Sequence, residues 1–189
     1  MATRREELAE AATDYALEHG LIGLSLRPLA EALGTSDRML LYHFRDKDDL
    51  VATILRTSTA RSMESIRALP APSDLREAVR ILWREVSTGR QQRCQRLYVE
   101  AAALRLFGQE PYAAEVRAAN TGWMTVLAGH FARTGLDRSA AKQAAALVDA
   151  AFMGLQLDIP LDSATQQRRT VADLADAVEA RWGGHVGSA

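Results

Sequence analysis

The sequence predicts an all-α protein. Ala, Leu and Arg, which favour helices, are abundant among its 189 residues, and apolar residues recur at helical spacing along most of the chain. Long stretches of strand-like alternation are missing. With 48% hydrophobic residues the chain is not of the disordered class, and its length suits a small domain joined to a larger one.

Residues 25–50, SLRPLAEALGTSDRMLLYHFRDKDDL, have the pattern of a helix-turn-helix with the helix that follows it. Apolar residues recur at helical spacing over residues 26–33, and Gly34 comes next as a residue that ends a helix at low cost. The Thr-Ser pair after it can cap a second helix, which buries Leu40 and Phe44. Two short helices around such a turn suit a reader of the DNA major groove.

A longer helix is expected on each side of this motif. Residues 4–19 form the first, and the second runs over about 47–69 until Pro-Ala-Pro at 70–72 stops it. We therefore expect a three-helix DNA-binding domain over residues 1–50. The helix over 47–69 connects it to a C-terminal helical domain over 73–189.

The motif resembles the N-terminal domain of the TetR family of transcriptional regulators. The matching positions are Ser25, Ala30, Leu33-Gly34, Leu40 to Phe44, Lys47 and Leu50. Leu41 departs from the family pattern, because it stands where an aromatic residue is usual and Tyr42 follows it; the phosphate contact of that aromatic residue is not carried over to Leu41. The resemblance is specific over residues 4–55 and architectural beyond them. It implies a homodimeric regulator.

Five helical stretches are expected in the C-terminal domain. Ser73 or Asp74 is expected to cap the first and Ser139 to cap the fourth. The second begins at Gln91, the third near Pro111, and the fifth at Asp162 or Ser163. In the fourth, residues 144–157 read AAALVDAAFMGLQL and are apolar nearly all the way round. Such a helix must be covered on both sides, and a second copy related by a two-fold axis can supply the cover. The alternative is a central core helix wrapped by its own neighbours.

The fifth helix can complete a four-helix bundle across that axis. The expected dimer contacts are Val148, Ala151, Leu155, Val171, Leu174 and Val178. We call the second helix of the motif the reading helix. A dimer would present two reading helices, one from each copy, to a pseudo-palindromic site on double-stranded DNA. The protein would then occupy an operator of two half-sites.

The DNA contacts are expected on the second helix of the motif and at two helix starts. Arg38 is the first candidate for a base contact, because its planar fork matches guanine O6 and N7. The other candidates for base contacts are Asp37, Met39 and Leu41. The expected phosphate contacts are Arg27, Thr35, Ser36, Tyr42, His43 and Lys47. An ordinary solvated side chain is the alternative for each of them.

Aromatic residues at helical spacing in the C-terminal domain are most simply core residues. The family resemblance implies in addition a small-molecule pocket between these helices. The residues expected to line it are Trp83, Tyr98, Trp123 and Phe152, with Glu100 and Gln156 as polar anchors. The ligand itself is not identified by the sequence.

Charge and composition permit this interpretation without demanding it. The net charge is −1, and residues 1–50 hold six Lys or Arg against ten Asp or Glu. The cations nevertheless lie at helix ends and turns around the reading helix, where they can neutralise phosphates. No apolar run reaches the roughly 18 residues of a membrane span, and Cys94 is the only cysteine, so we expect a cytoplasmic protein without membrane contact.

No catalytic pattern is recognised. The histidines lack metal-ligand spacing, no Gly-rich phosphate loop follows a strand, and Cys94 has no evident His or Asp partner. We therefore expect no cofactor, no metal and no enzyme activity.

The sequence thus indicates a repressor released from its operator by a small apolar or amphipathic ligand, through a population shift carried by the connecting helix. Two alternatives remain: a DNA-binding dimer without an inducer, and a helical small-molecule-binding enzyme.

Overall fold

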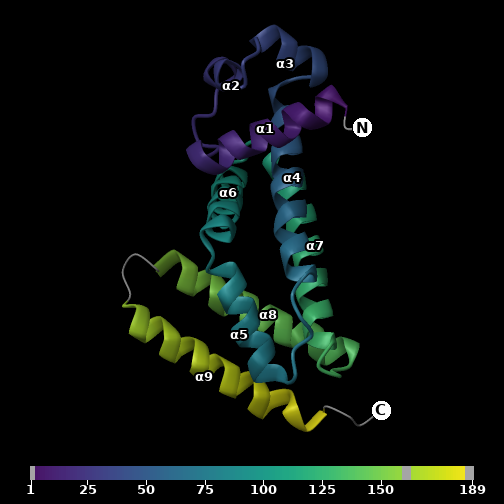
Figure 1. Cartoon of the computed structure of the whole chain (residues 1–189), viewed down its shortest axis with the longest axis vertical. Helices are drawn as coiled ribbons and strands as arrows, with labels where there is room; N and C mark the ends of the chain where they lie inside the picture. Colours follow the sequence, from purple (N-terminus) through teal and green to yellow (C-terminus); the bar gives the residue numbers. More distant parts are fainter. Residues whose placement is uncertain (1–2, 159–162, 186–189) are drawn as a thin grey trace. The chain divides into compact units, whose positions relative to one another are not determined.

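In the computed structural model of the chain, which describes residues 3–158 and 163–185, all regular structure is helical (Figure 1). In chain order the helices are α1 (Arg4–His19), α2 (Leu26–Ala32), α3 (Asp37–His43), α4 (Lys47–Arg67), α5 (Leu75–Val86), α6 (Gly89–Leu106), α7 (Tyr112–Ala132), α8 (Arg138–Asp158), α9 (Ala164–Trp182) and the short 3₁₀ helix η1 (Gly183–His185). The all-α prediction is confirmed.

The chain divides into two compact units. The N-terminal unit comprises the chain up to Ser62 together with Arg93–Asn120, and the C-terminal unit comprises Met63–Gln92 together with the chain from Thr121 onward. Helices α4, α6 and α7 contribute residues to both units. The proline turn at residues 70–72, where the sequence suggested the end of the connecting helix, belongs to the C-terminal unit.

The core of the N-terminal unit is built where α1 to α4, α6 and the first part of α7 meet. Leu29, Leu40, Phe44, Leu50 and Ile54 are at most 1% exposed there. The start of α1 is fixed by a reciprocal cap, in which the Thr3 hydroxyl accepts from the Glu6 amide and the Glu6 carboxylate accepts from the Thr3 amide. Local capping and burial therefore agree on the position of α1.

The core of the C-terminal unit lies among α5, α7, α8 and α9. Leu82, Phe131 and Val148 are fully buried in it. Helix α5 packs along α9, and the Arg76 guanidinium pairs with the Asp176 carboxylate 2.6 Å away. Residues from all four helices thus close a single apolar interior.

The helix starts in the C-terminal unit depend on side-chain caps. Asp74 caps α5 and Ser163 caps α9, two of the residues expected in that role; Asp162 lies outside the described residues. For α8 the expectation was wrong. Asp137 caps it, by accepting from the amides of Ser139 at 2.7 Å and Ala140 at 2.9 Å, because a carboxylate one residue before the helix reaches the free amides.

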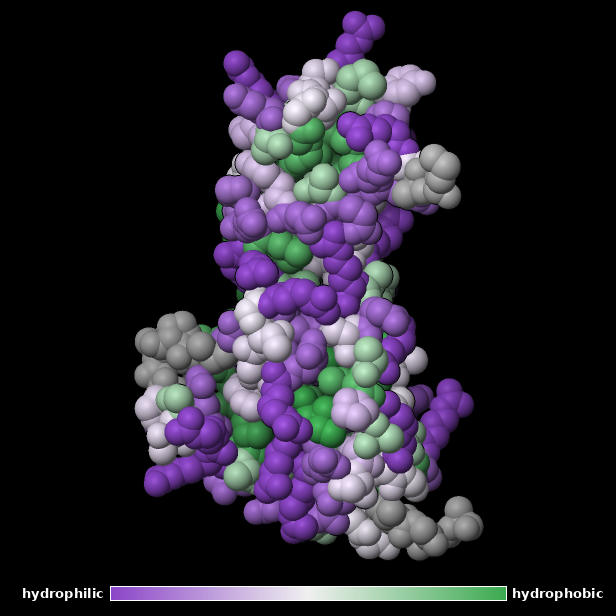
Figure 2. Space-filling view, viewed as in Figure 1, coloured by the Kyte–Doolittle hydropathy of each residue, from purple (hydrophilic) through white to green (hydrophobic). Residues whose placement is uncertain are grey.

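Hydrophilic residues cover much of the face drawn in Figure 2, with hydrophobic patches between them. The large hydrophobic side chains that stay exposed are Ile22, Met39, Leu41, Tyr42, Leu106, Phe107, Leu147 and Leu157. Helix α3 carries three of them, and α8 carries two. No helix within the described ranges is long and apolar enough to cross a membrane.

Candidate nucleic-acid interface

A tight turn joins α2 to α3. Gly34 adopts a φ of 64°, in the left-handed region that other residues rarely enter, and the Thr35 amide donates back to the Ala30 carbonyl at 2.9 Å. Ser36 then caps α3, since its hydroxyl accepts from the Met39 amide at 3.3 Å. The chain therefore reverses within a few residues and starts α3 at a defined point.

Helix α3 has one buried side and one exposed side. Leu40 is fully buried, as is Phe44 directly after the helix. Met39 is 45% exposed, Leu41 44% and Tyr42 79%, although all three side chains are largely apolar. A seven-residue helix that keeps such side chains in solvent while it packs firmly through Leu40 presents a surface suited to a partner.

The residues predicted to contact DNA are brought together around α3. They lie at the start of α2, in the turn, along α3 and at the first residue of α4. All of them are exposed except Thr35 and His43, which are half-buried. The ring of Tyr42 lies edge-on to that of His43, with 5.1 Å between the centroids. The residues predicted to contact DNA thus follow one another along the helix-turn-helix, as a single binding face requires.

The start of α4 is acidic, and Asp46 caps it. Lys47 was expected to add charge beside free amides, but Asp46 already fills part of that position: its Oδ1 accepts from the Asp49 amide at 2.7 Å. This bond, with help from the Arg45 side chain 3.1 Å away, lowers the pKa of Asp46 below its usual value. A phosphate approaching Lys47 would therefore meet a carboxylate nearby.

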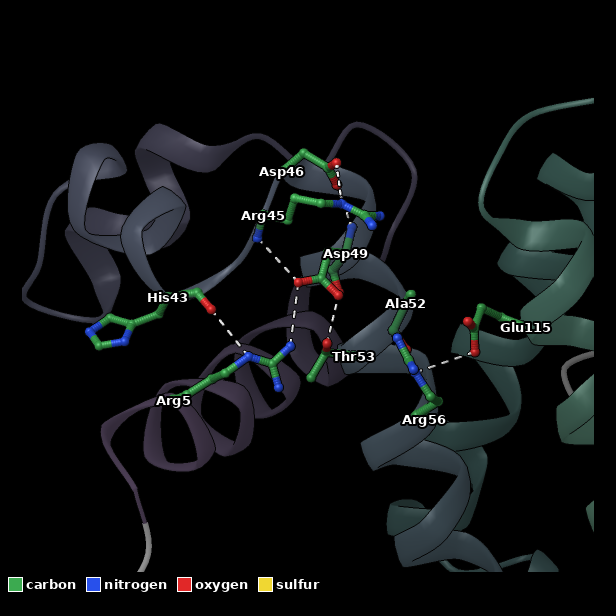
Figure 3. A network of polar contacts seen from close by, with 9 residues as sticks. All are labelled: Arg5, His43, Arg45, Asp46, Asp49, Ala52, Thr53, Arg56 and Glu115. Carbon is green, nitrogen blue, oxygen red and sulfur yellow. Dashed lines mark hydrogen bonds and ion pairs between the residues drawn. The ribbon is translucent and has the colours of Figure 1, made fainter.

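Arg5 of α1 reaches the end of α3 (Figure 3). Its Nε donates to the His43 carbonyl at 3.1 Å, and its Nη2 donates to the Asp49 carboxylate at 3.3 Å. Sequence reasoning placed Arg5 among cations near the reading helix and gave it no role of its own. His43 and Asp49 follow Arg5 by 38 and 44 positions in the chain, so only the fold brings them into contact with it.

The end of α1 is held by two residues of α6. Arg96 donates to the carbonyls of Leu17 at 2.5 Å and Glu18 at 3.1 Å. Glu100 lies one turn further along α6 and accepts from the two backbone amides that follow Gly20, at 2.5 and 3.1 Å. Glu100, expected to anchor a ligand, thus holds the link between α1 and α2.

The residues expected around a ligand are divided between the units. Tyr98 and Glu100 belong to the N-terminal unit, whereas the other four belong to the C-terminal unit. There the rings of Trp83 and Phe152 pack with centroids 5.0 Å apart. Gln156 donates to the Val86 carbonyl at 3.0 Å. A single cluster of all six is not formed within either unit.

Asp149 is a polar residue that the sequence reasoning overlooked. Its Oδ1 accepts from the Trp123 indole at 2.7 Å, and burial raises the pKa of its carboxyl above the usual value. It is the one acid within the apolar run at residues 144–157, and that isolation was the available signal. A half-buried carboxylate beside an aromatic side chain is suited to attract a cation.

The residues expected at a dimer contact mostly face inward. Val148, Val171 and Val178 are at most 5% exposed, inside the C-terminal unit's own core. Ala151, Leu155 and Leu174 are partly buried against or beside that core. These side chains pack within the protomer because α5, α8 and α9 bury their stripes against one another.

The opposite side of α8 remains open. An apolar stripe runs along it at helical spacing, and we call it the α8 stripe: Ala146, Leu147, Ala150, Gly154 and Leu157. Leu147 is 45% exposed and Leu157 is 56% exposed. A helix that is apolar all round thus has one face in the core and one in solvent.

The N-terminal geometry defines a helix-turn-helix protein, and comparison with known proteins agrees. Residues 8–54 match the model of the bacterial regulatory proteins of the tetR family. The transcriptional repressor AcnR of Corynebacterium diphtheriae is 35% identical over 66 residues, which are 35% of each chain. The match thus spans about a third of the length of this relative.

Solved structures extend the likeness over the whole chain. A transcriptional regulator from Rhodococcus sp. Rha1 superimposes with a TM-score of 0.76 at 24% identity, over 95% of this chain and 97% of that one. The multidrug binding protein EbrR complexed with ethidium gives a TM-score of 0.63 at 28% identity, over 92% and 98%. The resemblance inferred from the motif is therefore confirmed: residues 8–54 match the tetR-family model, and the chain has the fold of solved transcriptional regulators.

Proposed function

We propose that the protein is a sequence-specific transcriptional repressor that binds a pseudo-palindromic operator as a cytoplasmic homodimer and leaves it when a small amphipathic ligand binds. The observation that carries the proposal is α3. It is anchored through Leu40 and Phe44 and presents Arg38, Met39 and Leu41 on its free side. A short, rigidly seated helix with such a surface fits the major groove of B-DNA, where each base pair shows a distinct pattern.

Four exposed residues of α3 have a stated role in this proposal. Arg38 pairs with a guanine, while Met39 and Leu41 contact thymine methyl groups. Tyr42, with 79% of its surface exposed, is available to a phosphate. Position 41 itself holds a leucine and cannot donate a hydrogen bond, so a phosphate contact at the end of α3 falls to Tyr42 or His43.

The α8 stripe is the proposed dimer surface. It is apolar, exposed and contains Gly154 and alanines, which allow two helices to approach closely. Pairing two copies through the same stripe gives an isologous two-fold contact, the commonest symmetry among soluble oligomers. The interface proposed from sequence is thereby moved to the other side of α8, since Val148 belongs to the protomer core.

The proposed ligand site lies in the C-terminal unit, around the ring pair of Trp83 and Phe152 and the bonded pair of Trp123 and Asp149. Aromatic surface with one carboxylate favours a flat, amphipathic molecule that carries positive charge. EbrR has been solved with ethidium and with proflavin, which are molecules of this kind. AcnR, named as a repressor, supports the direction of regulation.

The dimer is released from its operator if the ligand binds more tightly to an arrangement that does not fit the DNA. In that arrangement the two reading helices no longer match successive major grooves. Half-sites about 34–36 Å apart tolerate little change in that spacing. The ligand must therefore discriminate between the two states, with a coupling of about 1–3 kcal/mol. Helices α4, α6 and α7 run through both units and provide continuous routes for such coupling.

Selection of DNA from a random pool by the purified protein tests the proposal. We expect an enriched pseudo-palindrome. Ethidium and proflavin are then titrated into the complex with the selected DNA, and release at concentrations that leave naked DNA unaffected supports the inducer. If a DNA motif is enriched but neither compound releases the protein from it, the alternative of a DNA-binding dimer without an inducer is favoured. No enriched sequence from folded protein would overturn the proposal.

A further inference from the structure

The side chain of Arg5 joins three helices (Figure 3). It projects from the first turn of α1, bonds through Nε to the carbonyl of His43, the last residue of α3, and bonds through Nη2 to Asp49 in the first turn of α4. Figure 3 shows the guanidinium between these two acceptors. One side chain therefore ties the end of α3 to the beginning of α4.

The position of the guanidinium is favourable for electrostatic reasons. The carbonyls at the end of a helix carry partial negative charge, and a cation there stabilises the helix. The guanidinium carbon also lies 5.0 Å from the ring centroid of Phe44, which is fully buried. A planar guanidinium can stack on a ring while it donates in two directions, and an ammonium group cannot.

Asp49 is itself held in place. Its carboxylate accepts from the Arg45 amide at 3.2 Å as well as from Arg5, and its own amide donates to Asp46 at 2.7 Å. Thr53 donates to the Asp49 carbonyl at 2.7 Å. Arg5 is thus bonded to a fixed carboxylate, and the contact limits how α3 can tilt.

We propose that Arg5 is a positioning residue of the DNA-reading helix, which fixes the angle of α3 to α1 and α4 and does not serve as a phosphate contact. This inference rests on the proposed DNA-binding function. Without the clamp, α3 remains a helix but samples other angles, so only a fraction of the molecules is competent to bind. Apparent operator affinity falls in proportion to that competent fraction. Non-specific binding, which depends on phosphate contacts, is spared.

The test compares Arg5→Ala and Arg5→Lys with the wild type on the selected operator and on DNA of scrambled sequence, over a series of salt concentrations. We expect Arg5→Ala to weaken operator binding on the order of tenfold, the size of one or two hydrogen bonds. The slope of log affinity against log salt concentration should stay unchanged. Arg5→Lys keeps the charge and should restore only part of the affinity.

Arg4→Ala is the matched control. Arg4 precedes Arg5 on α1 and is also a cation, but its guanidinium pairs with Glu7 within the same helix at 3.0 Å. Its loss should leave operator affinity close to that of the wild type. Asp49→Asn provides a second variant, because it weakens the same clamp without removing a cation, and it should lower operator affinity at an unchanged slope.

Two results would overturn the inference. A slope reduced by about 0.9 in Arg5→Ala would identify Arg5 as a phosphate contact. Equal operator affinity of the wild type and Arg5→Ala would show that the clamp does not orient α3. If Arg5→Ala fails to fold, as judged by circular dichroism, Arg5→Lys and Asp49→Asn decide the question. Failure of the wild type to select any DNA is a distinct result, which concerns the proposed function alone.

Discussion

A side chain at Gly20 would collide with Glu100, because a Cβ built there lies 2.8 Å from each carboxylate oxygen. Gly20 ends α1 with a φ of 86°, and Glu100 accepts from the next two amides. Arg96, one turn earlier on α6, donates to the last carbonyls of α1. Arg96 and Glu100 thus bind the backbone carbonyls before this turn and the backbone amides after it. The Glu100 carboxylate occupies space that a side chain at position 20 would need, so only glycine fits there.

Gly20→Ala should destabilise the N-terminal unit by about 2–3 kcal/mol, from the strained backbone and the displacement of Glu100 together. Urea unfolding followed by far-ultraviolet circular dichroism measures the loss. Gly23→Ala is the control, since Gly23 also has a positive φ, 79°, but nothing lies within 4 Å of its Cβ position. Equal losses of unfolding free energy in the two variants would mean that the Glu100 side chain moves aside at no cost.

Arg38→Ala should cost about 1–3 kcal/mol of operator binding and relax the preference at one base pair of each half-site. The reason is the loss of a bidentate contact to guanine, whereas phosphate contacts remain. Repeating the DNA selection with the variant shows which position loses its preference. An unchanged motif and affinity would remove Arg38 from base reading.

Leu147→Glu should convert dimers to monomers and, with them, weaken operator binding. It places a charge on the α8 stripe without entering the protomer core, because Leu147 is 45% exposed. Sedimentation of the purified variant measures its oligomeric state. Thr125→Glu, at an exposed position of α7 in the same unit, is the control. A Leu147→Glu protein that stays dimeric would place the interface elsewhere.

His130 should make the C-terminal unit less stable in acid. Its side chain is 2% exposed; Nε2 lies 3.1 Å from the Ala78 carbonyl and Nδ1 lies 2.6 Å from an Arg133 nitrogen. An arginine only donates, so Nδ1 accepts and the ring is neutral. Burial, and secondarily the Arg133 charge, lowers the pKa of His130 to about 4 from 6.5.

As the pH falls, His130 is therefore protonated in the unfolded chain before it is protonated in the folded protein. The contribution of neutral His130 is complete above pH 6.5 and is lost progressively as the pH falls toward 4, by up to about 3 kcal/mol. Tryptophan fluorescence reports the unfolding, since all three tryptophans lie in the C-terminal unit. His130→Gln should lack this pH dependence and His19→Gln should keep it. The same slope in both variants would assign the titration to other groups.

Asp149→Asn should stabilise the C-terminal unit modestly at neutral pH. Burial raises the carboxyl pKa, so the charged form is unfavourable in the fold, while an amide oxygen can still accept from Trp123. The gain should shrink as the pH falls toward 3.8, where the unfolded carboxyl is also protonated. Asp173→Asn, exposed on α9, is the control in urea unfolding. A destabilised Asp149→Asn would show that the charge itself is needed.

Local signals in the sequence were sufficient for the helix-turn-helix. Capping residues and apolar spacing act over three or four neighbours, so the bounds of α1, the turn at Gly34 and the burial of Leu40 and Phe44 could be read directly. The exposed positions Arg38 and Tyr42 followed from the same periodicity. The start of α8 shows the limit of such local reasoning, because the sequence pointed to Ser139 as the cap and the structure has Asp137 in that role.

The sequence by itself thus determined the helices, the helix-turn-helix motif and its resemblance to the TetR family, whereas only the tertiary structure decided which helix faces meet. Periodicity separates an apolar from a polar side, but α8 is apolar all round and carries no signal for which side enters the core. Glu100 and Asp149 show the same limit, since their partners lie 79 and 26 positions away in the chain. Contacts of that kind arise from the packing of whole helices, and no local propensity encodes them.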